Sequence, residues 1–382
     1  MKIGILTQPL HKNYGGLLQN YALQQVLLRA GHEVETIDHQ VSYVISSRER
    51  ASRCLYTILH LIKPSVYKKP SYRIKPEEVT EIRKLTNRFI ERYIRRTRQI
   101  TTRKGFYDIL QENKYDALVV GSDQCWRPCY NRFPSSMFFD FAKDKANLKR
   151  FSYAASFGTD VWEYSHDLTT QCSALAKKFD LITVREDSGI KLCKDNLGVD
   201  AKHVLDPTML LSKDDYVMLV ELEKEPQSKG TLFNYILDPS EKNTVFINNA
   251  AEQLSLKPFK VLPNKQAENR TKDDIKNHIS DCVYPAVTTW LRAFMDAEMV
   301  ICDSFHGCVF SIIFNKPFWV IGNNERGNAR FSSLLKMFGL EERLIDVKDR
   351  VDLNKPINWL KINSIREERR IYSINLFLNA LI

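Results

Sequence analysis

The sequence has no apolar run near the roughly 20 residues that a membrane-spanning helix needs. It begins MKIGILTQPL, a short apolar strand running into a loop, without the long apolar segment and small-residue cleavage site of a signal peptide. The eight cysteines are scattered, and the closest pair, Cys125 and Cys129, has no second pair or histidines to complete a zinc site. These absences predict a cytoplasmic protein, free or at the inner face of the membrane, without metal or disulfides.

The first glycine-containing turn does not match the common dinucleotide-binding motif. Gly15 and Gly16 lie between an apolar strand, Ile3 to Thr7, and a helix that ends before Gly31, but they do not form the GxGxxG dinucleotide fingerprint. The sequence has no internal repeat and no low-complexity tract. A dinucleotide cofactor and a repeat architecture are therefore not expected.

The 382 residues contain two series of alternating strands and helices. A chain of this length predicts two domains. Residues 211–230 are polar and charged, which predicts a linker, and a second βα series follows from Thr231. We predict an α/β protein with two Rossmann-like domains, 1–225 and 226–382, facing a central cleft. The helical pattern of 359–381 predicts a C-terminal helix that returns to the first domain.

Basic residues exceed acidic residues, 56 to 46, and the excess is local. Residues 41–105 interrupt the βα rhythm and predict a basic, helical insertion. Between Ile82 and Lys104 only Glu91 opposes nine basic side chains, which are Arg83, Lys84, Arg88, Arg92, Arg95, Arg96, Arg98, Arg103 and Lys104. This patch fits an anionic membrane surface, an acidic glycan or simply the solvated face of an amphipathic helix. Nucleic acid is not an expected partner, since no nucleic-acid motif accompanies the patch.

The most informative stretch follows a buried strand over Met299 to Cys302. Asp303 and Ser304 are typical of a helix N-cap, and an apolar helix follows from Gly307. His306 then lies in the first turn, at the carboxyl end of the strand, where open α/β sheets bind ligands and helix N-termini favour anions. His306 is therefore a candidate catalytic residue, and the alternative is that it only packs the turn.

Other strand ends carry polar residues too. Arg185 follows the strand Leu181 to Val184 and suits a carboxylate or phosphate, unless it only pairs with Glu186 or Asp187. Trp126 offers an aromatic face for a sugar or an enol, unless it belongs to the core. The remaining candidate substrate-binding residues in these loops are Asn13, Tyr14, Gly15, Gly16, Ser122, Asp123, Ser156, Glu186, Asp303, Ser304, Asn324, Glu325 and Arg330.

Together these segments resemble the polysaccharide pyruvyl transferase family. The matching segments are NYGGLLQNYAL (13–23), GSDQCW (121–126), SYAASFG (152–158), VRED (184–187), LDPTMLL (205–211), CDSFHG (302–307) and ARFSSLL (329–335). They run in family order, and residues 41–105 and 241–283 match poorly.

This resemblance implies a GT-B-like fold. It also implies transfer of the enolpyruvyl unit of phosphoenolpyruvate to a sugar of a cell-surface polysaccharide or exopolysaccharide precursor, which forms a pyruvate ketal and releases phosphate. By resemblance, His306 is the acid/base residue, Arg185 binds phosphoenolpyruvate, and Arg330 is a further anion ligand. No cofactor is implied beyond the donor substrate.

Two other functions fit the same residues. One is a GT-B glycosyltransferase that uses a nucleotide sugar, and the other is a non-catalytic glycan-binding protein that uses the basic segment. The sequence leaves open the acceptor sugar, the hydroxyl pair, the stereochemistry of the ketal and the oligomeric state. It also leaves open whether the acceptor is lipid-linked, nucleotide-linked or polymeric.

Overall fold

The computed structural model describes residues 1–40, 74–266, 270–322 and 328–382, with scattered residues between 52 and 63. Most of residues 41–73 of the expected insertion lies outside these described residues, as do Asn324 and Glu325 of the predicted site.

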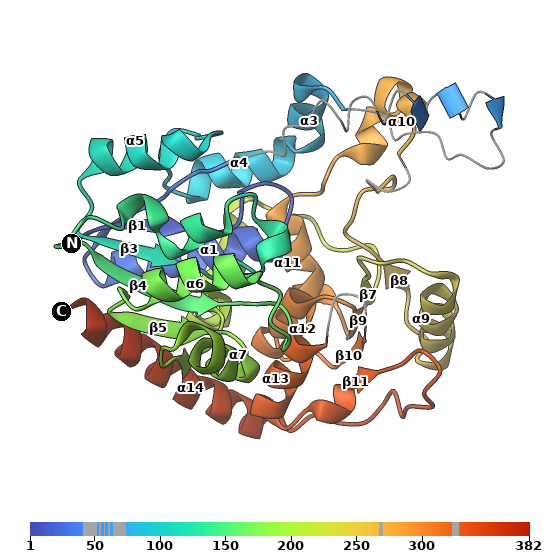
Figure 1. Ribbon diagram of the computed structural model, residues 1–382. Helices are drawn as coiled ribbons and strands as arrows, with labels where there is room; N and C mark the ends of the chain where they lie inside the picture. Colours follow the sequence, from blue (N-terminus) through green and yellow to red (C-terminus); the bar gives the residue numbers. More distant parts are fainter. Residues whose placement is uncertain are drawn as a thin grey trace.

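The first domain is built on a six-stranded sheet in the order β2-β1-β3-β4-β5-β6 (Figure 1). All of its neighbouring strands pair in parallel. The strands are β1 (Lys2–Leu6), β2 (Glu33–Thr36), β3 (Ala117–Val120), β4 (Lys149–Ala155), β5 (Leu181–Val184) and β6 (Lys202–His203).

The second domain is built on a five-stranded sheet in the order β11-β10-β9-β7-β8, which is also parallel. Its strands are β7 (Leu232–Tyr235), β8 (Pro258–Phe259), β9 (Met299–Cys302), β10 (Phe318–Ile321) and β11 (Leu344–Ile345). The predicted strand over Met299 to Cys302 is confirmed. Two parallel α/β domains are present, as the alternating pattern predicted.

Helices connect the strands. In the first part of the chain they are α1 (Tyr14–Arg29), α3 (Pro76–Ile82), α4 (Lys84–Tyr93), α5 (Arg103–Asn113), α6 (His166–Ala176), α7 (Asp187–Leu192) and α8 (Lys213–Leu222). The later ones are α9 (Glu241–Gln253), α10 (Lys272–Asn277), α11 (Val287–Asp296), α12 (Phe305–Ile313), α13 (Ala329–Phe338) and α14 (Trp359–Leu381). Within the described ranges, no helix combines the length and apolar character needed to cross a membrane.

The predicted linker at 211–230 is wrong in part, because helix α8 forms there. Ser212 caps α8 by accepting a hydrogen bond from the backbone N–H of Asp215, whose carboxylate accepts one from the Ser212 N–H. Tyr216 and Leu219 of α8 are buried in the core. The polar, charged composition of residues 211–230 therefore does not reveal that a capped amphipathic helix forms there.

Both faces of the first sheet are buried, and alternate residues divide between them. Leu118 and Val120 of β3 pack with apolar residues of α5 and α6. Ala117 and Val119 point to the opposite face, which is covered by α1, α4 and α14. This second cluster continues without a break to Val300 of β9 and the helices α11, α12 and α13. One apolar core therefore joins the two domains.

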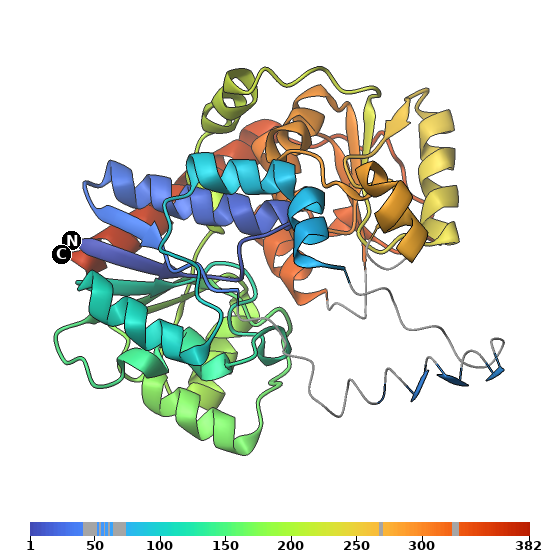
Figure 2. The ribbon, with the colours of Figure 1, turned by 90° about the horizontal axis from the view of Figure 1, so that it is seen from above.

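Helix α14 follows the last strand of the second domain and packs on the first. Its Phe377 is buried against Phe151 and Tyr153 of β4. Ser373 accepts a hydrogen bond from the Leu205 backbone N–H, and Lys149 donates one to the Leu381 carbonyl at 3.1 Å. The two ends of the chain consequently lie side by side in both views (Figures 1 and 2).

Basic residues of the segment around α4 pair with carboxylates, most of which come from elsewhere in the chain. Figure 2 shows α4 lying along α1. Arg88 and Arg92 share Glu223, at 2.9 and 2.6 Å. The other pairs are Lys84 with Glu81, Arg96 with Asp38, Arg98 with Glu112, and Arg103 with Asp140. Most of this patch is therefore locally neutralised, which does not favour a polyanion-binding surface.

Candidate active site in the cleft between the domains

His306 is positioned by the junction of β9 and α12. The apolar strand ends at Cys302, and Ser304 caps α12 by accepting a hydrogen bond from the backbone N–H of Gly307 at 3.5 Å. This places His306 in the first helical turn, as the sequence predicted. Asp303 does not cap α12. Its carboxylate accepts hydrogen bonds from the backbone N–H groups of Leu237 and Asp238, at 2.7 and 2.9 Å, so it fixes the loop after β7.

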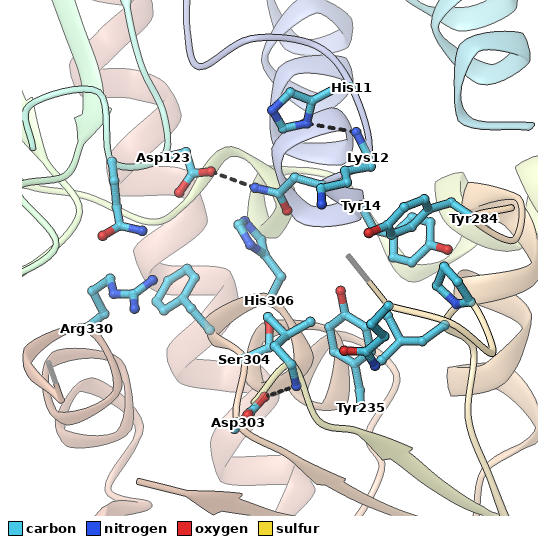
Figure 3. Close-up of a pocket in the computed structure, with 17 residues that line it drawn as sticks. His11, Lys12, Tyr14, Asp123, Tyr235, Tyr284, Asp303, Ser304, His306 and Arg330 are labelled. Carbon is cyan, nitrogen blue, oxygen red and sulfur yellow. Dashed lines mark hydrogen bonds between the residues drawn. The ribbon is translucent and has the colours of Figure 1, made fainter. Parts of the chain in front are cut away.

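A cavity of about 280 Å³ lies between the domains, in front of His306 (Figure 3). The first domain contributes side chains from the loop after β1 and from the loop after β3. The second contributes the ends of β7 and β9, the loop after β8, Tyr284 before α11, and the start of α13. The predicted site residues that line it are Asn13, Tyr14, Asp123, Asp303, Ser304, His306 and Arg330. The cavity therefore joins the carboxyl edges of both sheets, where α/β folds place ligand sites.

The imidazole of His306 is held from two sides. Its Nε2 lies 3.6 Å from Oδ2 of Asp206, a buried carboxylate that follows β6, so the contact is an ion pair and not a hydrogen bond. Its ring also packs on the backbone of Gly15 at the start of α1, where any Cβ would overlap it. The absence of a side chain on Gly15 therefore allows the close approach of His306.

Asp206 is ionised in this environment. Burial alone would raise its pKa, but His306 and Arg185 together lower the pKa below its ordinary value. The Oδ1 atom accepts hydrogen bonds from the backbone N–H and the hydroxyl of Thr208, at 3.0 and 2.7 Å. A fixed, charged carboxylate therefore faces the imidazole and orients it.

Arg185 lies behind this pair and does not line the cavity. Its Nε donates to Glu186 at 3.2 Å, Nη1 to Asp206 at 3.1 Å and Nη2 to Asp123 at 3.4 Å. Burial lowers the pKa of Arg185, but the three carboxylates raise it above its ordinary value. Because all three guanidinium nitrogens are engaged, this geometry does not support the expected direct contact of Arg185 with a donor substrate.

Two cationic side chains do line the cavity. Arg330, at the start of α13, has no hydrogen-bond partner for its Nε among the described residues, and burial followed by nearby Arg185 lowers its pKa. Lys12 lies opposite, with its ammonium 5.3 Å from the ring centre of Tyr284. These groups can receive the negative charges of a ligand.

Two residues that the sequence predicts to bind substrate have side chains that point into the core. Trp126 is fully buried, stacks on Phe138 at 4.8 Å and donates its indole N–H to the Met137 carbonyl. Ser122 is also fully buried and donates to the Ala154 carbonyl at 2.7 Å. Neither residue lines the cavity, so the ring of Trp126 is not available to stack on a sugar.

Three further predicted residues lie behind the cavity wall. The hydroxyl of Ser156 donates to the carboxylate of Glu186 at 2.6 Å, and both residues are buried. Gly16 lies in the first turn of α1 beside the Asn13 side chain. Tyr14 does line the cavity, but its hydroxyl donates to the Pro285 carbonyl and its ring stacks on Trp290, so it also joins the domains.

The sequence does not predict every residue that lines the cavity. His11, Lys12 and Gln124 lie in loops that it does predict, beside Asn13 and Asp123. Asp206 lies in the segment LDPTMLL, and its position after a strand could have indicated a residue of the site. Tyr235, Gln266 and Tyr284 of the second domain gave no signal. Among the described residues, no group of three or more His, Cys, Asp or Glu side chains is placed to hold a metal ion.

Several solved structures are similar to this chain along nearly its whole length. A UDP-GlcNAc 2-epimerase from Neisseria meningitidis, bound to UDP-GlcNAc, aligns with 100% of this chain and 99% of its own, at 9% identity and a TM-score of 0.50. UGT89C1 of Arabidopsis thaliana with UDP-L-rhamnose (11% identity, TM-score 0.48) and Acinetobacter baumannii MurG (10%, 0.47) each align over 99% of both chains. At these identities the likeness concerns the fold.

The fold and the site define a two-domain α/β protein of the GT-B type, with an Asp–His pair and cations in the cleft. The sequence model of the polysaccharide pyruvyl transferase family matches residues 13–325, and the chain belongs to this family. No curated protein sequence matches the chain.

Proposed function

We propose that this protein transfers the enolpyruvyl unit of phosphoenolpyruvate to two hydroxyl groups of a sugar, forming a pyruvate ketal and releasing phosphate. Family membership supports a pyruvyl transferase that acts on polysaccharide. The observation that carries the specific reaction is the placement of His306, backed by Asp206, in the same cavity as Arg330 and Lys12. The donor has a carboxylate and a phosphate, and the two cations match these charges.

The reaction needs a group that both gives and takes a proton. The methylene carbon of the donor accepts a proton, and the adjoining carbon becomes an oxocarbenium-like centre. One sugar hydroxyl bonds to that carbon, the bond to the phosphate oxygen breaks, and the second hydroxyl closes the ketal. One hydroxyl proton replaces the proton given to the methyl group, and the other leaves with phosphate. Imidazole suits this exchange near neutral pH.

Asp206 has a positioning role in this scheme. It faces Nε2 of His306 from a buried site and is itself held by Thr208 and Arg185. Arg185 therefore supports the reaction by neutralising and placing carboxylates, while Arg330 and Lys12 contact the donor. In this proposal Arg330 and Lys12, and not Arg185, bind phosphoenolpyruvate directly.

Donor binding can be tested without knowing the acceptor. Phosphoenolpyruvate at about 100 times its dissociation constant should stabilise the wild type by about 2.7 kcal/mol, which a thermal-shift assay detects. Arg330→Gln should lose most of this shift. Arg95→Gln is the matched control, because Arg95 is exposed and does not line the cavity.

The result that would contradict donor binding is a wild-type shift with a nucleotide sugar and none with phosphoenolpyruvate. For turnover, phosphate release from phosphoenolpyruvate would be followed with a panel of oligosaccharide acceptors. His306→Gln should lower the rate by about 10²–10⁴-fold, the usual contribution of a general acid–base group. A wild-type rate in that variant would remove His306 from the mechanism.

A further inference from the structure

A second cavity of about 330 Å³ shares the loop after β1 with the first, although no described residue lines both. It lies between the loop after β1, the end of the segment after β2, and the helices α3 and α4. Leu10 lines this cavity, whereas the next residue, His11, lines the first. Arg83 also lines the second cavity, and its charge acts on both His11 and Tyr284 of the first. The two cavities are therefore neighbours along one side of the cleft.

Arg83 differs from most basic residues around it. Its side chain is partly buried, and burial is the main cause of its lowered pKa. The groups that act on its charge are Tyr284 and Arg270, and no carboxylate is among them. Nearby Arg88, Arg92 and Arg96 each pair with a carboxylate. Arg83 thus presents a guanidinium to the cavity without an acidic partner among the described residues.

Asp38 is the complementary group on the same wall. It is 1% exposed, and its Oδ2 accepts a hydrogen bond from Arg96 at 2.6 Å. Its Oδ1 has no hydrogen-bond partner among the described residues. A buried carboxylate oxygen without a donor is costly, and it points to a donor that a ligand or water supplies.

We propose that this second cavity binds a sugar residue of the acceptor saccharide, next to the sugar that reacts in the first cavity. The inference rests on the proposed function. Sugar hydroxyls both donate and accept hydrogen bonds, so they can pair at once with Asp38 and with Arg83. Asn87 and Gln40 add amides that do the same, and Leu10 and Ile90 offer an apolar surface for the sugar ring.

Other ligands fit this wall less well. A phosphate or another compact anion would meet the carboxylates of Asp38 and Glu91. An apolar ligand would leave Asp38 and Arg83 without partners. The cavity volume lies within the range of about 300–1,000 Å³ that is usual for small-ligand sites.

The test starts from binding. The full chain would be applied to an array of neutral and uronate-containing oligosaccharides, and the dissociation constant of the tightest one would be measured by titration calorimetry. Arg83→Gln and Asn87→Ala should each raise this constant at least tenfold. Arg95→Gln should change it less than twofold, because its side chain is exposed and lines neither cavity.

Donor binding separates this proposal from the proposed function. Arg83→Gln should keep the thermal shift with phosphoenolpyruvate, and in turnover it should raise the KM for the saccharide without changing kcat. Wild-type saccharide affinity in both Arg83→Gln and Asn87→Ala, or no saccharide binding by the wild type, overturns the subsite. Saccharide binding that depends on Arg83, in a protein that ignores phosphoenolpyruvate, would overturn the reaction and keep the subsite.

Discussion

At the scale of single residues, the site depends on close approach between the domains. His306 of the second domain packs its ring on Gly15 of the first, where a side chain has no room. Gly15→Ala should therefore displace the imidazole from Asp206. We expect turnover to fall at least tenfold and the free energy of unfolding to fall by about 1–3 kcal/mol, as for other overpacked sites. The measurements are steady-state kinetics and urea unfolding.

The control for this change is Gly16→Ala. Its Cβ would lie 3.0 Å from the side-chain nitrogen of exposed Asn13, which can shift at the cost of one hydrogen bond to Asp123. A smaller effect is expected on both rate and stability. Equal effects of the two substitutions would show that contact with His306 is not the cause.

Substitution of Arg185 should destabilise the protein much more than substitution of Arg330. Arg185→Met leaves three buried carboxylates without their counter-charge, and breaking a buried pair costs about 3–5 kcal/mol of unfolding free energy. Arg330→Gln breaks no ion pair among the described residues and should cost below about 1 kcal/mol. Chemical denaturation of both variants would measure the two losses of unfolding free energy. A larger loss in Arg330→Gln would reverse the two assigned roles.

His11 predicts a pH effect on stability. Burial, followed by Arg83 and Lys12, lowers the pKa of His11 from 6.5 to about 3. Between these values the unfolded chain binds the proton and the folded protein does not, so stability falls as the pH drops below 6.5. At pH 5.5 the loss is about 1.4 kcal/mol. His11→Gln should lose less unfolding free energy than the wild type between pH 7.5 and 5.5, and equal losses would contradict the shift.

At the scale of elements, the sequence predicts strands and their ends better than it predicts side-chain direction. The strand Met299 to Cys302 and the helical turn of His306 could be predicted because apolar runs and capping residues are local signals. The burial of Trp126 could not, because both faces of a parallel sheet are covered and a loop residue can turn into either. Two of the partners of Arg185, Asp123 and Asp206, follow β3 and β6, so only the tertiary fold brings them to it.

Helix α14 is an element whose stabilising contacts lie on another domain. Phe377 is 1% exposed and packs on two aromatic rings of β4, so Phe377→Ala should reduce the free energy of unfolding by about 3–5 kcal/mol. Leu360→Ala is the control in the same helix, because Leu360 is 87% exposed and should be close to neutral. Thermal or urea unfolding would compare them. A neutral Phe377→Ala would mean that α14 adds little to the first domain.

At the scale of the whole molecule, one apolar cluster runs from the first sheet to the second. It includes Ile5 and Val119 on one side and Val300 and Phe318 on the other. We therefore expect the two domains to unfold together, in one calorimetric transition with equal calorimetric and van't Hoff enthalpies. Two resolved transitions would contradict this, and would mean that the shared core is weaker than the core of each domain.

The return of α14 also bears on how the protein is made. The surface of β4 that α14 covers is complete once the first sheet has left the ribosome, yet residues 204–358 must still be synthesised before α14 exists. At about 5–20 residues per second this interval is on the order of 10 seconds. During translation, Phe151 and Tyr153 are therefore without their final cover, and a nascent chain of this protein presents an apolar surface that chaperones can bind.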